Sequence, residues 1–373
     1  MRKRPSVILA SLFISAQLFA APKFGVSQAI LKLLNSRAAG SPRDFEEDAE
    51  IVAKDAAEGK SVQQFVLAVV SRDANVPEVA RLDDATRKRY FDQSRDKIKE
   101  MAEKGNAMSL YLLSLETNDP ALLKRAAEAG NVQAMNAWGT YAMEQAFNSG
   151  TMLQEDVERM VGKSYGYFKA AADRGDANGL YNVGMCHLCG WGVAENKEKA
   201  FEHFKAAAML GHAGAINNIG GFYRDGMVVE QDFAIATKWF RKSANLGNPY
   251  GQLNYGFALQ RGEGVEQDDK KAFAMYRAAA EGGSEEAKNA VGMCYYNGTG
   301  VKKDEHEAVK WFTAAAKDGV AAAMENLSEC YDTGAGGLER DPTQAMVWKI
   351  RARAANGDKN AATWLAQNGY TPR

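Results

Sequence analysis

The chain has 373 residues, of which 46% are hydrophobic and 25% are charged, and its formal net charge is −1. This length and composition are those of a globular protein, with room for two compact domains or one elongated one. The charge is nearly balanced and no basic stripe stands out, so the sequence gives no electrostatic reason to expect nucleic-acid binding.

The first residues have the pattern of a secretory signal peptide. Three cations at residues 2–4 precede a mostly apolar run over residues 6–19, and Ala20 and Ala21 offer small residues for cleavage. We therefore predict a signal peptide at residues 1–21 and a periplasmic or secreted mature chain, with an uncleaved anchor as the alternative. No later segment reaches the roughly 20 apolar residues that a membrane helix needs, so no membrane span is expected after cleavage.

Beyond the signal peptide, the sequence divides near residue 105. Residues 22–105 are predicted to be an N-terminal helical region with a break near residues 73–84. They match the downstream repeat only weakly, so they are either a cap or a separate small helical domain. Residues 106–373 are predicted to be a repeat array, from a compressed unit at residues 107–130 to a closing half-unit at residues 361–367.

A fixed period organises this second part of the chain. We take one glycine as the origin of each unit, and it recurs every 36 residues, at Gly184, Gly220, Gly256 and Gly292. Six residues after each origin stands another glycine, and nine residues after it stands a valine. Twenty residues after each origin stands an aromatic residue: Phe204, Phe240, Tyr276 and Phe312. Matched columns of this kind are the signature of stacked structural repeats.

The columns predict a helix, a turn, a second helix and a second turn in every unit. The glycine after the first helix suits the left-handed residue that ends a helix. Asp232, Asp268 and Asp304 are placed to cap the second helix, and Asp304 with Glu307 fits a capping box. The origin glycine lies inside the first helix, where it costs about 1 kcal/mol against alanine. We therefore expect another backbone to pass close to it, with alanines of the second helix as the small partners.

Two units depart from the strict pattern. The interval from Gly139 to Gly184 exceeds the regular period by nine residues, and we expect the extra residues to form a longer inter-helix loop at about residues 147–155. Another unit follows the four strict ones, with Ser328 at the origin and Gly334-Ala335-Gly336 in the turn.

These columns resemble the Sel-one-like repeat family, a relative of the tetratricopeptide repeats. The resemblance rests on Asn254-Tyr255-Gly256, on Gly262-Glu263-Gly264-Val265 and on Lys310-Trp311-Phe312. The predicted fold class is all-α, an α-solenoid of stacked helix-turn-helix repeats, and the resemblance implies a right-handed superhelix that acts as a protein-interaction scaffold. The chain departs from the family pattern at Val228, where the second turn glycine is expected, and at His187 and Leu259, where an aromatic residue is usual.

Analogy with tetratricopeptide repeats places ligand-facing positions on the first helices, which line the concave face. An asparagine ladder occupies one of these positions, and an amide both donates and accepts hydrogen bonds. The ladder could therefore bind the backbone of a protein or extended peptide, between apolar and aromatic anchors. The predicted contact residues are Tyr181, Asn182, Met185, Asn218, Leu253, Asn254, Phe257, Asn289, Met293, Tyr296 and Asn326. The alternative is that the asparagines hydrogen-bond water or the neighbouring repeat.

The four cysteines do not suggest a disulfide framework. Cys186, Cys294 and Cys330 occupy the same slot in their units, and equivalent positions of stacked helices lie about 10 Å apart, which is too far for a bridge. Cys186 and Cys189 form a CxxC motif, but at the end of a helix, where the dipole disfavours a thiolate. Redox or zinc chemistry at this motif is the less favoured reading.

Enzyme chemistry has little support in the sequence, and no cofactor is predicted. Ser94 to Lys97 matches an SxxK pattern, but it lies in a charged helical run without a companion motif. The principal hypothesis is a binding scaffold, and the alternative is an enzyme of cell-wall or β-lactam chemistry, as cysteine-rich relatives suggest. A third possibility is that the helices before residue 105 recognise the partner while the repeats act as spacers.

Overall fold

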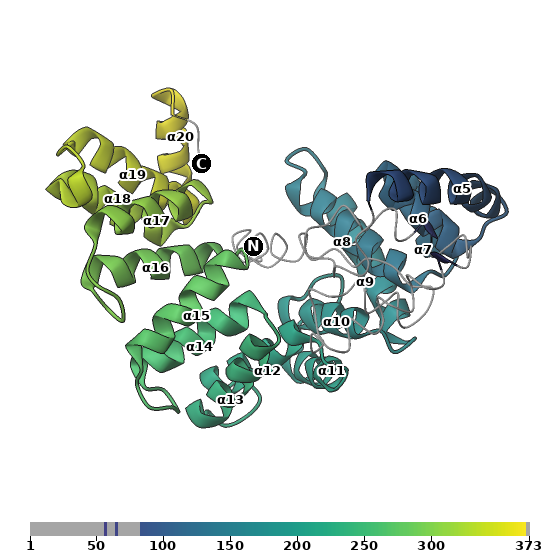
Figure 1. Cartoon of the computed structure of the whole chain (residues 1–373), viewed down its shortest axis with the longest axis horizontal. Coiled ribbons are helices and arrows are strands. Elements are labelled where there is room, and N and C mark those ends of the chain that lie inside the picture. The colour runs from purple at the N-terminus through teal and green to yellow at the C-terminus, as the bar shows by residue number, and fades with distance from the viewer. Residues whose placement is uncertain (1–55, 58–63, 66–82, 371–373) are drawn as a thin grey trace. The chain divides into compact units, whose positions relative to one another are not determined.

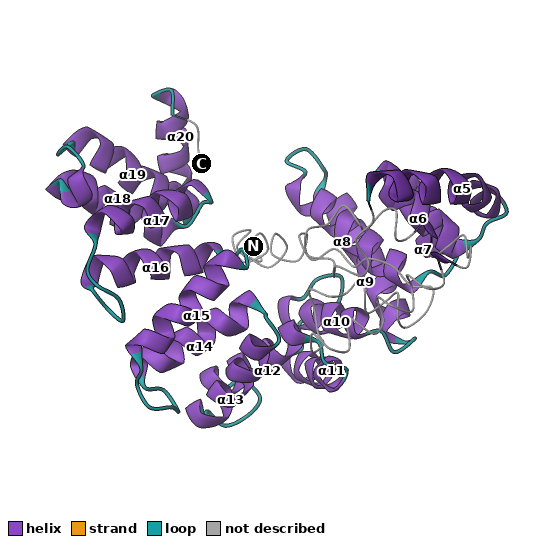
Figure 2. Ribbon diagram, in the orientation of Figure 1, coloured by secondary structure: helices purple, strands orange, loops and turns teal. Residues whose placement is uncertain are grey.

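The computed structural model describes residues 56–57, 64–65 and 83–370. The predicted signal peptide at residues 1–21 and most of the region up to residue 82 lie outside the described residues. The described part of the chain is all-α, with helices joined by short turns and without strands (Figure 2). None of the described helices has both the length and the apolar character needed to cross a membrane.

The chain divides into two compact units between Ala215 and Ile216. The N-terminal unit contains seven complete described helices (Figure 1). They are α5 (Asp84–Glu103), α6 (Ala107–Thr117), α7 (Pro120–Glu128), α8 (Val132–Asn148), α9 (Gln154–Ala172), α10 (Ala177–Cys189) and α11 (Lys197–Met209).

The boundary falls within the first turn of α12, and the remaining helices belong to the C-terminal unit. They are α12 (Ala213–Asp225), α13 (Phe233–Asn245), α14 (Pro249–Arg261), α15 (Asp269–Glu281), α16 (Glu285–Asn297), α17 (Glu305–Lys317), α18 (Ala321–Thr333), the short 3-10 helix η2 (Ala335–Gly337), α19 (Pro342–Ala355) and α20 (Lys359–Gln367). From α14 to α19 each α-helix packs against the one before it and the one after it in the sequence. The predicted fold class, a solenoid of stacked helix pairs, is confirmed.

The predicted helix ends are confirmed in the regular repeats that follow α9. The first helices α10, α14, α16 and α18 end at a glycine in the left-handed conformation, with φ between 71° and 76°. The side chains of Asp232, Asp268 and Asp304 each accept a hydrogen bond from a backbone N–H of the following helix. The reciprocal half of the capping box is missing, because the Asp304 N–H donates to the Tyr295 carbonyl and the Glu307 carboxylate pairs with Lys310.

A second glycine of each turn touches the preceding repeat. A Cβ atom on Gly264 would overlap the Phe233 carbonyl at the start of α13, and one on Gly300 would overlap the corresponding Asp269 carbonyl of α15. Both glycines are also left-handed, with φ near 69°. Val228 holds this position in the α12–α13 turn with φ of 66°, a conformation that costs an L-residue roughly 1–2 kcal/mol.

The origin glycines accommodate an aromatic ring. A Cβ on Gly220, Gly256 or Gly292 would lie 2.6 Å from a ring carbon of Phe240, Tyr276 or Phe312, the aromatic residue twenty positions further on. The expected close approach of a second backbone is therefore secondary, with the Ala236 carbonyl 3.2 Å from the Gly220 Cβ position. The sequence showed that space was needed at this glycine, but not that a buried ring fills it.

The nine extra residues after Gly139 do not form the longer loop that we expected. They lengthen the helices, because α8 has 17 residues and α9 has 19, against 13 in each of the regular helices that follow. The connecting segment is short. Glu155 and Asp156 fall in the first turn of α9, where acidic side chains stabilise a helix N-terminus. Because of this local preference, the inserted residues form the start of α9 instead of a loop.

Two adjacent glycines of α12 make the packing argument testable. Gly220→Ala is expected to destabilise the protein by about 1–3 kcal/mol, because its Cβ would press on Phe240. Gly221→Ala is expected to stabilise it by up to about 1 kcal/mol, because nothing lies within 4 Å of the added Cβ and alanine favours the helix. Thermal and urea unfolding of the two variants measures both effects, and a similar change in both would contradict the ring contact.

Candidate binding face

The predicted contact residues lie on the first helices of successive repeats. Tyr181, Asn182 and Met185 are on α10, Asn218 is on α12, Leu253, Asn254 and Phe257 are on α14, Asn289, Met293 and Tyr296 are on α16, and Asn326 is on α18. In the C-terminal unit we call the surface formed by Asn218, Asn254, Phe257, Asn289, Met293, Tyr296 and Asn326 the first-helix face. Their spacing of three and four residues along each helix places them on one side.

Asparagine side chains join neighbouring first helices. The Asn254 Nδ2 of α14 donates to the Asn217 Oδ1 of α12 at 2.8 Å, and the Asn326 Nδ2 of α18 donates to the Asn289 Oδ1 of α16 at 2.8 Å. In the N-terminal unit, the Asn182 Nδ2 of α10 donates in the same way to Asn136 of α8, at 3.4 Å. The structure thus shows amide hydrogen bonds between neighbouring repeats, and contact of these amides with a ligand stays a prediction.

The bridge leaves hydrogen-bonding capacity on each amide. An asparagine carries two N–H donors and an oxygen with two acceptor sites, and the bridge uses one donor of Asn254 and one acceptor site of Asn217. Both side chains are partly exposed. The bridged amides therefore hold two first helices together and still present polar groups to a ligand.

Three of the predicted apolar anchors are packed in the protein interior. The exposed fractions of Tyr181, Met185 and Leu253 are 5%, 5% and 6%, so these side chains are not at the surface to contact a partner. Tyr181 packs against the rings of Phe204 and His212, with centroids 5.6 and 4.3 Å away, and Leu253 belongs to the buried core around Tyr276. Met293, in contrast, is 36% exposed.

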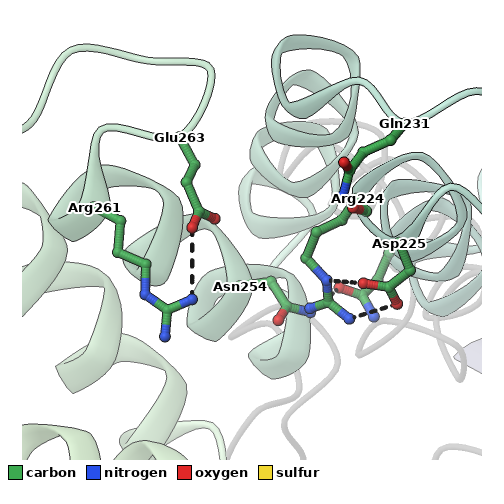
Figure 3. Close-up of polar contacts among 7 residues, drawn as sticks. Arg224, Asp225, Gln231, Asn254, Arg261 and Glu263 are labelled. Carbon is green, nitrogen blue, oxygen red and sulfur yellow. Dashed lines mark hydrogen bonds and ion pairs between the residues drawn. The ribbon is translucent and has the colours of Figure 1, made fainter.

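Charged side chains that we did not single out border the amides (Figure 3). The Arg224 guanidinium binds Asp225 through two hydrogen bonds of 2.7 and 2.9 Å, and Arg261 lies 3.6 Å from Glu263. The hydrogen bond that Arg224 donates to Asp225 raises the pKa of Arg224. Each arginine follows a bridged asparagine by seven residues, that is, two helical turns along the same side, and this spacing is the sequence signal that could have found them.

The side chains of the cysteine and histidine motif on α10 are packed and uncharged rather than gathered around a common point. All four cysteines are free thiols, and burial raises the pKa of Cys186 and, to about 11, that of Cys189. The His187 and His203 rings stack in parallel with centroids 5.7 Å apart. No group of three or more metal-binding side chains comes together within the described residues.

The SxxK pattern is not arranged for catalysis. Ser94 is fully buried in α5, and its hydroxyl donates to the Tyr90 carbonyl at 2.6 Å. Its oxygen therefore lies inside the helix packing. This placement favours the interpretation of the pattern as a chance match.

Comparison with known families identifies the repeat. The Sel1 repeat model matches six consecutive segments: residues 132–176, 177–212, 213–248, 249–284, 285–320 and 321–356. Because these segments make up more than half of the chain, the protein belongs to the Sel1 repeat family, and the resemblance seen in the sequence is confirmed. No curated protein matches the chain.

Solved structures of the same family are similar to this chain. A Sel1 repeat protein from Oxalobacter formigenes is 26% identical, with a TM-score of 0.55 over 66% of this chain and 96% of that one. A protective antigen of uropathogenic Escherichia coli that displays an SLR fold is 26% identical, with a TM-score of 0.49 over 86% of this chain and 67% of that one.

A buried carboxyl group occupies α8 at the offset that Arg261 holds on α14. Glu144 is only 7% exposed, and its Oε1 has no hydrogen-bond partner among the described residues. Burial raises its pKa to about 7. Between the ordinary carboxyl pKa and this value the folded state holds a proton that the unfolded state has lost, so this group makes the protein less stable as pH rises through that window.

Glu144→Gln removes this titration and keeps the shape of the side chain. We expect the variant to match the wild type in thermal stability near pH 4 and to exceed it near pH 8, because only the wild type must then bury a charge. Glu158→Gln, an exposed change beyond the first turn of α9 with the same charge difference, is the control. Equal stability of the wild type and Glu144→Gln at both pH values would contradict an unpaired buried carboxylate.

Proposed function

We propose that this Sel1 repeat protein is a periplasmic or secreted scaffold that binds a protein or extended peptide on its first-helix face. The observation that carries the proposal is the pairing of Asn217 with Asn254 and of Asn289 with Asn326, both at 2.8 Å. It places partly exposed amides in a row across successive helices. An extended peptide backbone presents N–H and C=O groups that such amides can satisfy without demanding a particular sequence.

Side chains next to the amides supply apolar contact. Phe257 is partly exposed and packs edge-on against Tyr276, with ring centroids 5.3 Å apart, while Arg261 lies over its ring. A ring held in this way loses little side-chain entropy when a ligand arrives. Gly221 lies at the same offset on α12, and the space around its Cβ position is open, so a ligand backbone can come close to the helix there.

The proposed location rests on the sequence. The cations at residues 2–4, the apolar run and the small residues at 20 and 21 are the features of a secretory signal. These residues lie outside the described part of the chain. Fractionation of the cells that produce the protein, with N-terminal sequencing of the mature form, tests both the compartment and the cleavage after Ala21.

We favour binding over the alternative, an enzyme of cell-wall or β-lactam chemistry. The Ser94 hydroxyl is buried, and the Cys186 and Cys189 thiols have raised pKa values, so neither motif offers an activated nucleophile. Nitrocefin hydrolysis by the purified chain tests the alternative. A hydrolysis rate of the wild type above that of a Ser94→Ala variant would support the enzyme.

Selection from a library of short random peptides tests the binding proposal. We expect Gly221→Arg to weaken the binding of selected peptides by about tenfold or more, because its side chain enters the space over α12. Gly166→Arg is the matched control, since Gly166 lies on the second helix α9 and also has nothing within 4 Å of its Cβ position.

Both variants should keep the helical circular dichroism of the wild type. Failure to select any peptide would contradict the proposal. Equal loss of binding in the two variants would also contradict it, because binding would then not depend on the first-helix face.

A further inference from the structure

The part of the first-helix face formed by α16 and α18 differs in charge from the rest. Along α18, Glu325, Glu329 and Asp332 follow one another at spacings of four and three residues, so they lie on one side of the helix. All three are exposed, and α18 contains no lysine or arginine. No carboxylate of the three has an ion-pair partner within the described part of the chain. We call these residues the acidic row.

Two members of the acidic row lie at the end of α18 where a negative charge lowers the stability of the helix. Glu329 and Asp332 lie near the C-terminal end of α18, which finishes at Thr333. The partial negative charge of a helix C-terminus disfavours a carboxylate by about 0.3–1 kcal/mol. Residues whose charge opposes a local preference of the helix, with no compensating contact inside the fold, are candidates for contact with a binding partner.

Apolar surface on α16 lies next to the acidic row. Met293 is 36% exposed and Tyr296 is partly exposed. The bond between Asn326 and Asn289 holds α18 beside α16. Tyr296 is close enough to Glu329 for that carboxylate to contribute, after burial, to the raised pKa of the tyrosine. The surface therefore combines carboxylates with a methionine and a tyrosine, and is more than a solvated acidic stripe.

The chain itself binds a cation at the edge of this surface. The Lys303 Nζ lies 5.8 Å from the centre of the Tyr296 ring and 2.7 Å from the Glu305 carboxylate. An ammonium group is thus held between an aromatic face and a carboxylate, an arrangement that attracts cations. The Arg340 Nε donates a hydrogen bond to the backbone carbonyl oxygen of Asp332, at 2.8 Å. These two cations stand at the border, and the carboxylates of the acidic row stay unpaired.

The corresponding part of α12 and α14 has no such surplus. There the arginines Arg224 and Arg261 are matched by Asp225 and Glu263. Unpaired negative charge on this face is therefore a property of the α16–α18 end within the C-terminal unit.

We infer that the α16–α18 surface binds a lysine- or arginine-containing peptide segment of the partner protein. Lysine and arginine combine an aliphatic stem with a cationic head. The stems fit Met293 and Tyr296, and the heads fit the carboxylates of Glu325, Glu329 and Asp332, while the bridged amides of Asn289 and Asn326 take backbone groups. This inference rests on the proposed function and names the chemistry of the partner at one end of the face.

Fluorescence anisotropy with two defined probes tests the inference. We expect a labelled peptide of alternating alanine and lysine to bind the full chain, and its alanine and glutamate counterpart not to bind. The variant Glu325→Gln/Glu329→Gln/Asp332→Asn should lose about tenfold or more in affinity for the lysine peptide. Met293→Ser should weaken binding as well, since a purely electrostatic attraction would not involve this side chain.

The matched control changes the net charge by the same amount elsewhere. Glu103, Glu230 and Glu266 are exposed and lie at the end of α5 or in the turns, and their triple replacement by glutamine should leave affinity for the lysine peptide nearly unchanged. Equal losses in the two triple variants would overturn the inference, because binding would then follow net charge alone. Failure of the lysine peptide to bind a chain that does select other peptides would overturn it while leaving the proposed function standing.

Discussion

One contact determines how successive repeats fit together: the second residue of the turn that is left-handed, a glycine in every regular turn except at Val228, lies against the backbone at the start of the preceding second helix where it is Gly264 or Gly300. At Gly264 and Gly300 the left-handed conformation and the nearby carbonyl both exclude a side chain. A hydrogen bond from the Thr237 hydroxyl to the Glu263 carbonyl, at 2.7 Å, ties the same turn to α13. The register of a repeat on its predecessor therefore depends on backbone geometry more than on side-chain identity, and this is why the turn recurs while its surroundings vary.

With the register set in this way, the first helices come close enough for short side chains to bridge them. An asparagine reaches only a few ångströms from its helix, yet Asn254 meets Asn217 and Asn326 meets Asn289 at 2.8 Å. The bridges do not occur at the intervening contact, where the equivalent positions carry Leu253 and Ala290. Amide bridges therefore join α12 to α14 and α16 to α18, whereas apolar residues occupy the equivalent positions between α14 and α16. The two bridged pairs differ in charge: the arginines of α12 and α14 are paired with carboxylates, and the carboxylates of α18 are unpaired within the residues that the structure describes.

Much of the fold follows from the sequence because its determinants are local. Left-handed glycines, capping aspartates and the aromatic column each act within one repeat, and their spacing predicted the helix pairs and the family. Contacts between repeats were harder to predict. The asparagines gave no sign of whether they faced a ligand or each other, and Tyr181, Met185 and Leu253 occupied slots that analogy placed on the surface although they are buried. The extended α8–α9 pair was missed because helix propensity in the insert was not weighed against the turn pattern. Location outside the cytoplasm remains a prediction from residues 1–21.

Thermal unfolding of Gly264→Ala and Gly262→Ala tests the central constraint most directly. Both glycines are left-handed, with φ of 69° and 71°, so both substitutions strain the backbone by a similar amount. Only at Gly264 would the new Cβ also overlap the preceding repeat, whereas at Gly262 its nearest neighbour lies 3.6 Å away. The account predicts a clearly larger loss of stability for Gly264→Ala than for Gly262→Ala. Equal losses would show that the turn glycines serve only their own conformation, and would contradict the claim that they set the packing between repeats.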